Sequence, residues 1–241
     1  MTEFKLLSHA SATVSYKGKT LLMDPWLLGS CYWRSWWNYP PVKPEIKTNL
    51  NVDAIYITHV HWDHWHGPTL KKLFSKDTLI ITHDEPNTRS INDLKSIGFK
   101  NIKLLKHAES IKIGEIKITP YQFGLFLNDS ALVIETPDFK LINANDCKIA
   151  GASLRRIINK HGRFDFALRS HSSANDRVCY SVKDSDLILL FFNFNSPEKL
   201  KLTRPFSFWL LVLPPLFKLN CNSKGKSNLS IFSIPKGFCP I

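Results

Sequence analysis

Short apolar runs separated by turn residues fill the chain up to residue 168, and they predict many β-strands with only a few helices. The first three runs predict a β-meander, and two later runs flank Thr136-Pro137-Asp138 and predict a hairpin. The expected strands are residues 4–7, 13–16, 20–23, 54–57, 78–82, 101–105, 110–113, 116–120, 131–135, 139–143 and 164–168. The expected helices are residues 68–74, 85–97 and 152–159, and Gly98 is the expected stop of the second. This pattern predicts an α/β protein.

Residues 28–50 interrupt the pattern with a long stretch rich in aromatic residues and prolines. We expect a loop without regular structure here, and loops of this length inside a compact domain are often functional. Trp36 and Trp37 are therefore candidates for contact with a substrate. The alternative is that the aromatic side chains pack under the loop as a small separate core.

Four residues with metal-binding side chains gather between a predicted strand and the helix that follows it. His59, His61, Asp63 and His64 lie within six positions, in the order H-x-H-x-D-H. Imidazole and carboxylate groups bind zinc, iron and manganese, and side chains two positions apart on an extended segment point the same way. We expect His59 and His61 to hold one ion and Asp63 and His64 a second, rather than four solvated loop residues.

Three further residues near strand ends bear on this cluster. His9 follows the first predicted strand, where it is either a hydrogen-bonded structural residue or a group that contacts substrate. Asp24 follows the third strand and is expected to orient a ligand imidazole from behind. His66 lies outside the spacing of the cluster, and we expect an ordinary loop histidine.

The chain of 241 residues has a net charge of +12 that is unevenly distributed. Residues 187–241 hold seven basic side chains and one acidic side chain, Glu198, and so carry half of the excess. No module that combines aromatic and basic residues precedes them. We therefore expect no nucleic-acid partner and a small-molecule substrate of anionic character.

Cysteine content and hydropathy bear on the cellular compartment of the protein. The five cysteines are scattered and never spaced C-x-x-C, which favours a reducing environment. The N-terminus lacks the pattern of a signal peptide, and no apolar run reaches about 18 residues. We expect a cytoplasmic protein without a membrane span, and the sequence leaves its oligomeric state open.

Several motifs together resemble a known family. Asp24-Pro25-Trp26-Leu27, Trp36-Trp37 and the histidine cluster, in this order, resemble the metallo-β-lactamase superfamily. Within it they are similar to the metallo-β-lactamase-like domain of CMP-N-acetylneuraminate hydroxylases, close to ascorbate-lactonase-like proteins. The resemblance extends over roughly residues 5–180. It implies one αββα sandwich, which we place at residues 1–186, and two divalent metal ions, zinc or alternatively iron or manganese.

The resemblance also implies roles for residues far from the cluster. It makes Asp146 the carboxylate that bridges the two ions, although Asp146 could instead cap the helix predicted after it. The segment with His171 and Asn175 resembles the loop that borders the substrate pocket.

The chain departs from the family in two places. No histidine lies at 123–128, where the family supplies a third ligand to the first ion, and none follows His171. His107 falls in the right interval, but on a turn between earlier strands.

Residues 187–241 are apolar or basic and do not match the end of the family's domain. They are either a divergent C-terminal segment or the product of an out-of-frame end.

Three functions remain open. The first is a metallo-hydrolase, in which a metal-bound hydroxide attacks an ester, lactone, amide or phosphodiester and Asp63 and His64 are catalytic. The second is an oxidoreductase component that needs a separate Rieske partner. The third is a non-catalytic protein with a degraded metal site.

Overall fold

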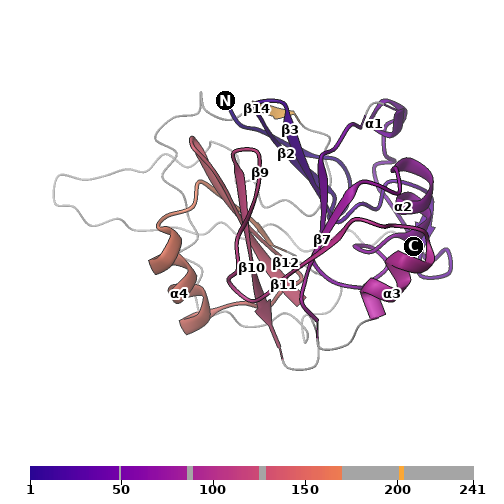
Figure 1. Ribbon diagram of the computed structural model, residues 1–241. Helices are drawn as coiled ribbons and strands as arrows, with labels where there is room; N and C mark the ends of the chain where they lie inside the picture. The colour runs from indigo at the N-terminus through magenta and orange to yellow at the C-terminus, as the bar shows by residue number, and fades with distance from the viewer. Residues whose placement is uncertain (49, 86–88, 125–128, 170–200, 204–241) are drawn as a thin grey trace, which may run out of the picture. The chain divides into compact units, whose positions relative to one another are not determined.

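Two β-sheets lie face to face in the computed structural model, with helices on their outer sides (Figure 1). The structure describes residues 1–48, 50–85, 89–124, 129–169 and 201–203, and all of them fall in one compact unit, Met1–Leu210. The segments that contain His171, Asn175 and nearly all of residues 187–241 lie outside the described residues. Among the described residues, no helix is long and apolar enough to cross a membrane.

The first sheet has seven strands in the order β14-β1-β2-β3-β6-β7-β8. The strands β1, β2 and β3 form the predicted antiparallel meander, and β6, β7 and β8 add to β3 in parallel. Parallel neighbours end at the same edge, so the residues that follow β3 and β6 are brought together there. The bounds are β14 Lys201–Thr203, β1 Glu3–Leu6, β2 Ala12–Tyr16, β3 Lys19–Met23, β6 Ala54–Ile57, β7 Leu79–His83 and β8 Ile102–Leu105.

The second sheet has five strands in the order β13-β12-β11-β10-β9. Strands β9 to β12 are antiparallel neighbours, and β13 pairs with β12 in parallel. The pairing of β12 with β13 shifts register between Asn143 and Asn145, just before Asp146. The bounds are β9 Ile111–Ile113, β10 Ile116–Phe123, β11 Asp129–Thr136, β12 Phe139–Asn145 and β13 Phe166–Arg169.

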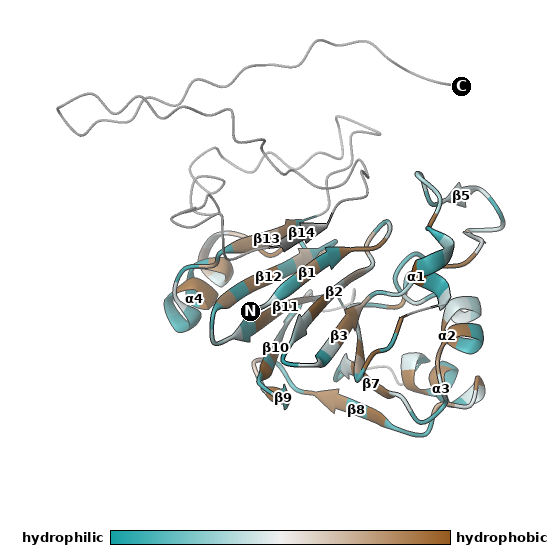
Figure 2. Cartoon of the chain, turned by 90° about the horizontal axis from the view of Figure 1, so that it is seen from above, coloured by the Kyte–Doolittle hydropathy of each residue, from teal (hydrophilic) through white to brown (hydrophobic). Residues whose placement is uncertain are grey.

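Three apolar clusters hold the layers together. The largest joins the inner faces of the two sheets, with side chains such as Val14, Tyr56 and Ile134. A second lies between the first sheet and the helices α1 (Pro44–Thr48), α2 (Gly67–Leu73) and α3 (Arg89–Ser96), and a third lies under α4 (Gly151–His161). Helix α4 lies on one side and α2 and α3 on the other (Figure 2). This arrangement confirms the predicted αββα sandwich.

The expectation of an unstructured loop over residues 28–50 was wrong. A two-stranded hairpin, β4 (Ser30–Cys31) with β5 (Trp36–Trp37), lies there and is followed by α1. Three consecutive residues, Tyr32, Trp33 and Arg34, have φ of 47°, 54° and 69°, and this left-handed run closes the turn. Aromatic residues rarely adopt this conformation, so the composition of the segment does not announce a turn.

Candidate metal centre

The histidine cluster is held in a tight turn between β6 and α2. The backbone amides of His64 and Trp65 both donate to the carbonyl of His61, at 3.0 and 2.7 Å. His66 ends the turn as the N-cap of α2, where its Nδ1 accepts a hydrogen bond from the amide of Thr69 at 3.3 Å. His66 therefore has a structural role, as expected, and the residues before it are fixed in position by the fold.

One possible ligand group consists of His59, His61 and Asp146. The ligand atoms of these three side chains all lie within 4.8 Å of one another. Nε2 of His59 lies 2.8 Å from Nδ1 of His61 and 3.9 Å from Oδ2 of Asp146. This is the first set that the sequence predicts.

A second group consists of His9, Asp63 and His64, whose ligand atoms also lie within 4.8 Å of one another. Oδ2 of Asp63 is 3.1 Å from Nε2 of His9 and 3.3 Å from Nε2 of His64. Sequence reasoning treated His9 as a structural residue or a substrate contact. The structure adds it to the predicted pair of Asp63 and His64 as a possible ligand.

Asp146 lies between the two groups. Its Oδ2 is 3.4 Å from Nε2 of His64 and 3.9 Å from Nε2 of His59. A carboxylate so placed can contribute to both ions and reduce the repulsion between them. The alternative role as a helix cap was wrong, because the N-cap of α4 is Ala150.

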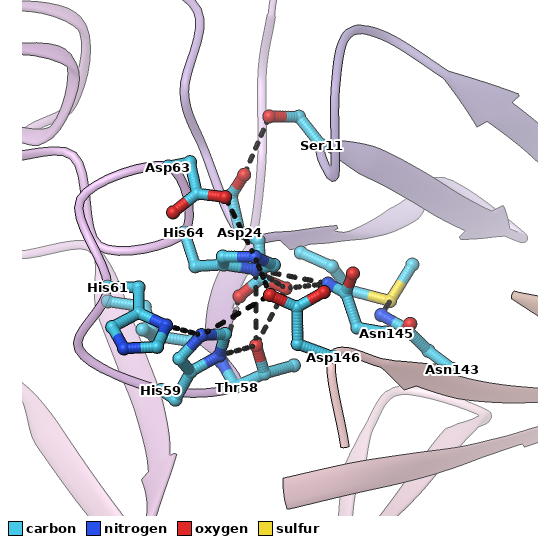
Figure 3. Close-up of polar contacts among 12 residues, drawn as sticks. Ser11, Asp24, Thr58, His59, His61, Asp63, His64, Asn143, Asn145 and Asp146 are labelled. Carbon is cyan, nitrogen blue, oxygen red and sulfur yellow. Dashed lines mark hydrogen bonds and ion pairs between the residues drawn. The ribbon is translucent and has the colours of Figure 1, made fainter. Parts of the chain in front are cut away.

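A buried carboxylate behind the cluster orients two of the histidines (Figure 3). Asp24 is fully buried, with a positive φ of 44°, and its Oδ2 lies 3.0 Å from Nδ1 of His64. Asp24 also accepts hydrogen bonds from the amide and the hydroxyl of Thr58, at 2.8 and 2.9 Å. Because the Thr58 hydroxyl donates to Asp24, it can only accept from Nδ1 of His59, 3.1 Å away. Both rings then direct Nε2 toward the carboxylates of the site, where it can bind a metal ion in place of a proton.

Ionisation in the site follows from burial and charge. Burial, with the nearby His64 and His61, lowers the pKa of His59 to about 3, so this ring stays neutral and able to bind a metal. Burial alone would lower the pKa of His64, but the Asp24 charge and hydrogen bonds with Asp146 raise it well above the ordinary value. Burial opposes ionisation of Asp63, yet hydrogen bonds from His64, His9 and Tyr32 lower its pKa.

The side chains fit a metal centre. Nε2 of His64 is buried and faces carboxylate oxygens of Asp63 and Asp146, 3.3 and 3.4 Å away. A buried ring nitrogen that faces two carboxylates needs either a proton or a metal cation between them, and all three groups can bind a cation there. The donor set of imidazoles and carboxylates suits zinc, iron or manganese.

Two residues near the site were not anticipated. Asn145, with φ of 41°, donates from Nδ2 to Oδ2 of Asp24 at 2.6 Å. Asp129, the first residue of β11, places Oδ1 4.0 Å from Nδ1 of His59. Burial and the charge of Asp146 raise its pKa. Neither residue has a spacing signal in the sequence, because their approach depends on how the two sheets pack.

The tryptophans and His107 remain to be placed. Trp26 is buried at 1% exposure, whereas Trp36 and Trp37 are 48% and 64% exposed, so the last two do not form a small core. His107 belongs to neither ligand group among the described residues, and its Nδ1 accepts from the amide of Gln122 at 3.2 Å.

Comparisons with known proteins identify the family. A model of the β-lactamase superfamily domain matches residues 3–123, and the chain belongs to that superfamily. Its fold is the αββα sandwich of metallo-β-lactamase type.

Cytidine monophosphate-N-acetylneuraminic acid hydroxylase of Mus musculus is 28% identical over 147 residues, which cover 58% of this chain and 26% of that protein. The chain thus spans about a quarter of the length of the curated relatives it matches.

Two solved structures share the fold. Isothiocyanate hydrolase from Delia radicum gut bacteria matches with a TM-score of 0.55 at 24% identity, over 73% of each chain. CmlA, a diiron β-hydroxylase from Streptomyces venezuelae, matches with a TM-score of 0.53 at 17% identity, over 69% of this chain and 34% of that one. At these identities the likeness concerns the fold alone.

Proposed function

We propose that the chain is a metal-dependent hydrolase of an ester, lactone, amide or phosphodiester. The observation that carries the proposal is the position of Asp146 between two groups of ligand-type side chains. His59 and His61 would hold one ion, Asp63 and His64 the other, and Asp146 both. When bound, such ions supply Lewis acidity and an ionised water as nucleophile near neutral pH. We favour zinc, with iron or manganese as alternatives.

The protein's own groups contribute position and proton acceptance. The ring of His64 is fixed from behind by Asp24, so its Nε2 cannot turn away from Asp63 and Asp146. Asp63 is kept ionised by its donors, and its Oδ2 can accept a hydrogen bond from a water and orient it. Asp63 and His64 are therefore the proposed catalytic residues.

The substrate side of the site is assigned by exposure and charge. Trp36 and Trp37 are both exposed, and the ring of Trp36 lies edge-on to His9; we propose that the two side chains contact a small substrate. The net charge of +12 favours an anionic one. His171 and Asn175 remain predicted contacts. The scattered cysteines support a cytoplasmic location. Among the described residues, Cys31 and Cys147 are buried and form no disulfide.

The experiment is a metal analysis combined with a hydrolase screen on the wild type and His61→Ala. The substrates would be ester, lactone, amide and phosphodiester probes. The proposal expects uptake of about two ions and at least one activity in the wild type, and uptake of about one ion with loss of activity in the variant. Metal uptake without any activity on these bonds would contradict it. Unchanged activity in His61→Ala would contradict it as well.

A second candidate is an oxidoreductase component, because the curated relatives are hydroxylases. These 241 residues hold no C-x-H…C-x-x-H pair for a Rieske cluster, so this candidate needs a cluster held outside them, as a separate partner would supply. Iron bound in preference to zinc, together with binding of a sugar nucleotide, would favour this candidate. Absence of both would remove it. A third candidate, a non-catalytic protein, predicts that His61→Ala leaves the cellular role intact.

A further inference from the structure

The exposed aromatic side chains of the described residues are gathered in one place. Apart from Met1, the exposed large hydrophobic residues of the described ranges lie in the hairpin, just after it or in the histidine cluster: Trp33, Trp36, Trp37, Tyr39 and Trp62. Their exposures range from 39% for Trp62 to 85% for Trp33. Figure 2 shows the hairpin strand β5 near α1, at the periphery of the unit. Exposed apolar groups that cluster in this way mark a binding surface.

Four rings form a continuous surface that we name the aromatic wall: Tyr32, Trp33, Trp36 and Trp62. The ring of Tyr32 is stacked on Trp62, with centroids 5.7 Å apart and planes 19° apart. Trp33 lies 4.7 Å from Trp62 in a tilted contact, and Trp36 meets Tyr32 edge-on at 5.0 Å. Such stacked and edge-on contacts are the arrangements that aromatic rings prefer, and another flat ring can extend them.

The aromatic wall is attached directly to the metal centre. Trp62 lies between His61 and Asp63 in the sequence, one from each ligand group. The hydroxyl of Tyr32 donates to Oδ1 of Asp63 at 2.7 Å, and Trp36 lies edge-on to His9 at 6.1 Å. A ligand on the wall would therefore lie next to the ligand-type side chains.

We propose that the aromatic wall binds a flat aromatic ring of the substrate, carried on a neutral or anionic molecule. This rests on the proposed function, whose substrate class it narrows. The only charged side chain of residues 30–39 is Arg34, which would repel a cationic ligand. The contacts among the rings and the hydrogen bond from Tyr32 to Asp63 restrict the side chains of the wall before a ligand binds, which lowers the entropy cost of stacking.

The test measures binding, not turnover. Metal-loaded wild type is titrated with naphthylphosphonate and with methylphosphonate, which share the anionic group and differ in the ring. We expect naphthylphosphonate to bind at least roughly tenfold more tightly. Trp33→Ala and Trp62→Ala should each remove most of that preference, Trp62→Phe should keep most of it, and Tyr39→Ala, which changes an exposed aromatic residue outside the wall, should leave it intact.

Equal affinity for the two phosphonates would overturn the inference without contradicting the proposed metal centre. If neither phosphonate binds, naphthol is titrated against the metal-free protein and the indole N–H signals are followed by NMR. Shifts of the Trp33 and Trp62 signals would then support the aromatic wall although the proposed function has failed, and their absence would overturn both. A third outcome concerns membranes. In it, the wild type shows no naphthyl preference but co-sediments with phosphatidylcholine–phosphatidylserine vesicles, and Trp33→Ala abolishes that co-sedimentation. This result would assign the aromatic wall to a membrane surface and overturn the inference.

Discussion

Nδ1 of His64 lies 3.0 Å from Oδ2 of Asp24, a carboxylate with no exposed surface. Through Thr58, the same carboxylate also fixes the proton on Nδ1 of His59. One buried charge therefore orients one histidine in each ligand group. The pairing follows from the topology, because Asp24 comes directly after β3, next to the end of β6. The amide of Asp24 donates to the carbonyl of Tyr56 at 3.0 Å.

Asp24→Asn should weaken metal binding by roughly 10- to 100-fold, as loss of a carboxylate behind a ligand histidine commonly does. The amide is almost the same size, so the change removes the charge and leaves the packing. Metal affinity measured by competition with a chelator checks this. Asp53→Asn changes a partly exposed carboxylate that pairs with Lys19 and should leave the affinity as it is. An affinity equal to that of the wild type would show that Asp24 is only structural.

Tyr32→Phe should lower the free energy of unfolding by about 1 kcal/mol, because Asp63 loses the donor 2.7 Å from its Oδ1. The phenyl ring keeps the stack with Trp62. Urea unfolding of the metal-free protein measures the change, with Tyr39→Phe, at an exposed position, as the matched control. Identical midpoints for Tyr32→Phe and the wild type would mean that this hydrogen bond contributes nothing.

Glu85 should make stability fall as pH rises. Its side chain is 6% exposed, neither carboxyl oxygen makes a hydrogen bond, and burial, opposed by the nearby Ser90 hydroxyl, raises its pKa to about 7. Its ordinary value is 4.5, so between these values the folded chain binds the proton more tightly than the unfolded chain. The contribution of Glu85 is therefore fully present below 4.5 and is lost as pH passes 7, by about 2–3 kcal/mol.

The comparison is the wild type against Glu85→Gln, unfolded in urea at pH 5 and pH 8. The variant, which cannot ionise, should be more stable than the wild type at pH 8 and similar to it at pH 5. A stability difference that is the same at both pH values would assign the effect to packing and not to ionisation.

Gly98→Ala should cost about 1 kcal/mol of stability, because Gly98 ends α3 with φ of +101°. The nearest atom that an added Cβ would meet is Lys76 Cδ at 3.6 Å, so the cost comes from the backbone and not from a clash. Thermal unfolding measures it, with Lys95→Ala on the exposed side of the same helix as the control. A loss no larger than that of the control would contradict this reason.

Local patterns were sufficient to predict most strands and helices, whereas the αββα layering was implied by the family resemblance. The strand–turn–helix around His59 and His61 is encoded by neighbouring residues, and so is the stop at Gly98. The helix predicted from residue 85 begins, among the described residues, at Arg89. The role predicted for Asp24 as an orienting carboxylate agrees with its contacts.

Features that depend on tertiary packing were not predictable. His9 joins Asp63 across 54 positions, and Asn145 reaches Asp24 across 121. No local periodicity reports such pairs. The hairpin at Ser30–Trp37 was missed for another reason, since Tyr32, Trp33 and Arg34 adopt a conformation for which their side chains have no preference.

The central claim is that two ligand groups share Asp146, and metal stoichiometry tests it most directly. The full chain is loaded with zinc or with iron, freed of excess metal by gel filtration, and analysed by plasma mass spectrometry beside His61→Ala and Asp146→Asn. We expect about two ions per wild-type chain, about one in His61→Ala and fewer than one in Asp146→Asn. Less than about one ion per two wild-type chains with either metal would contradict the account.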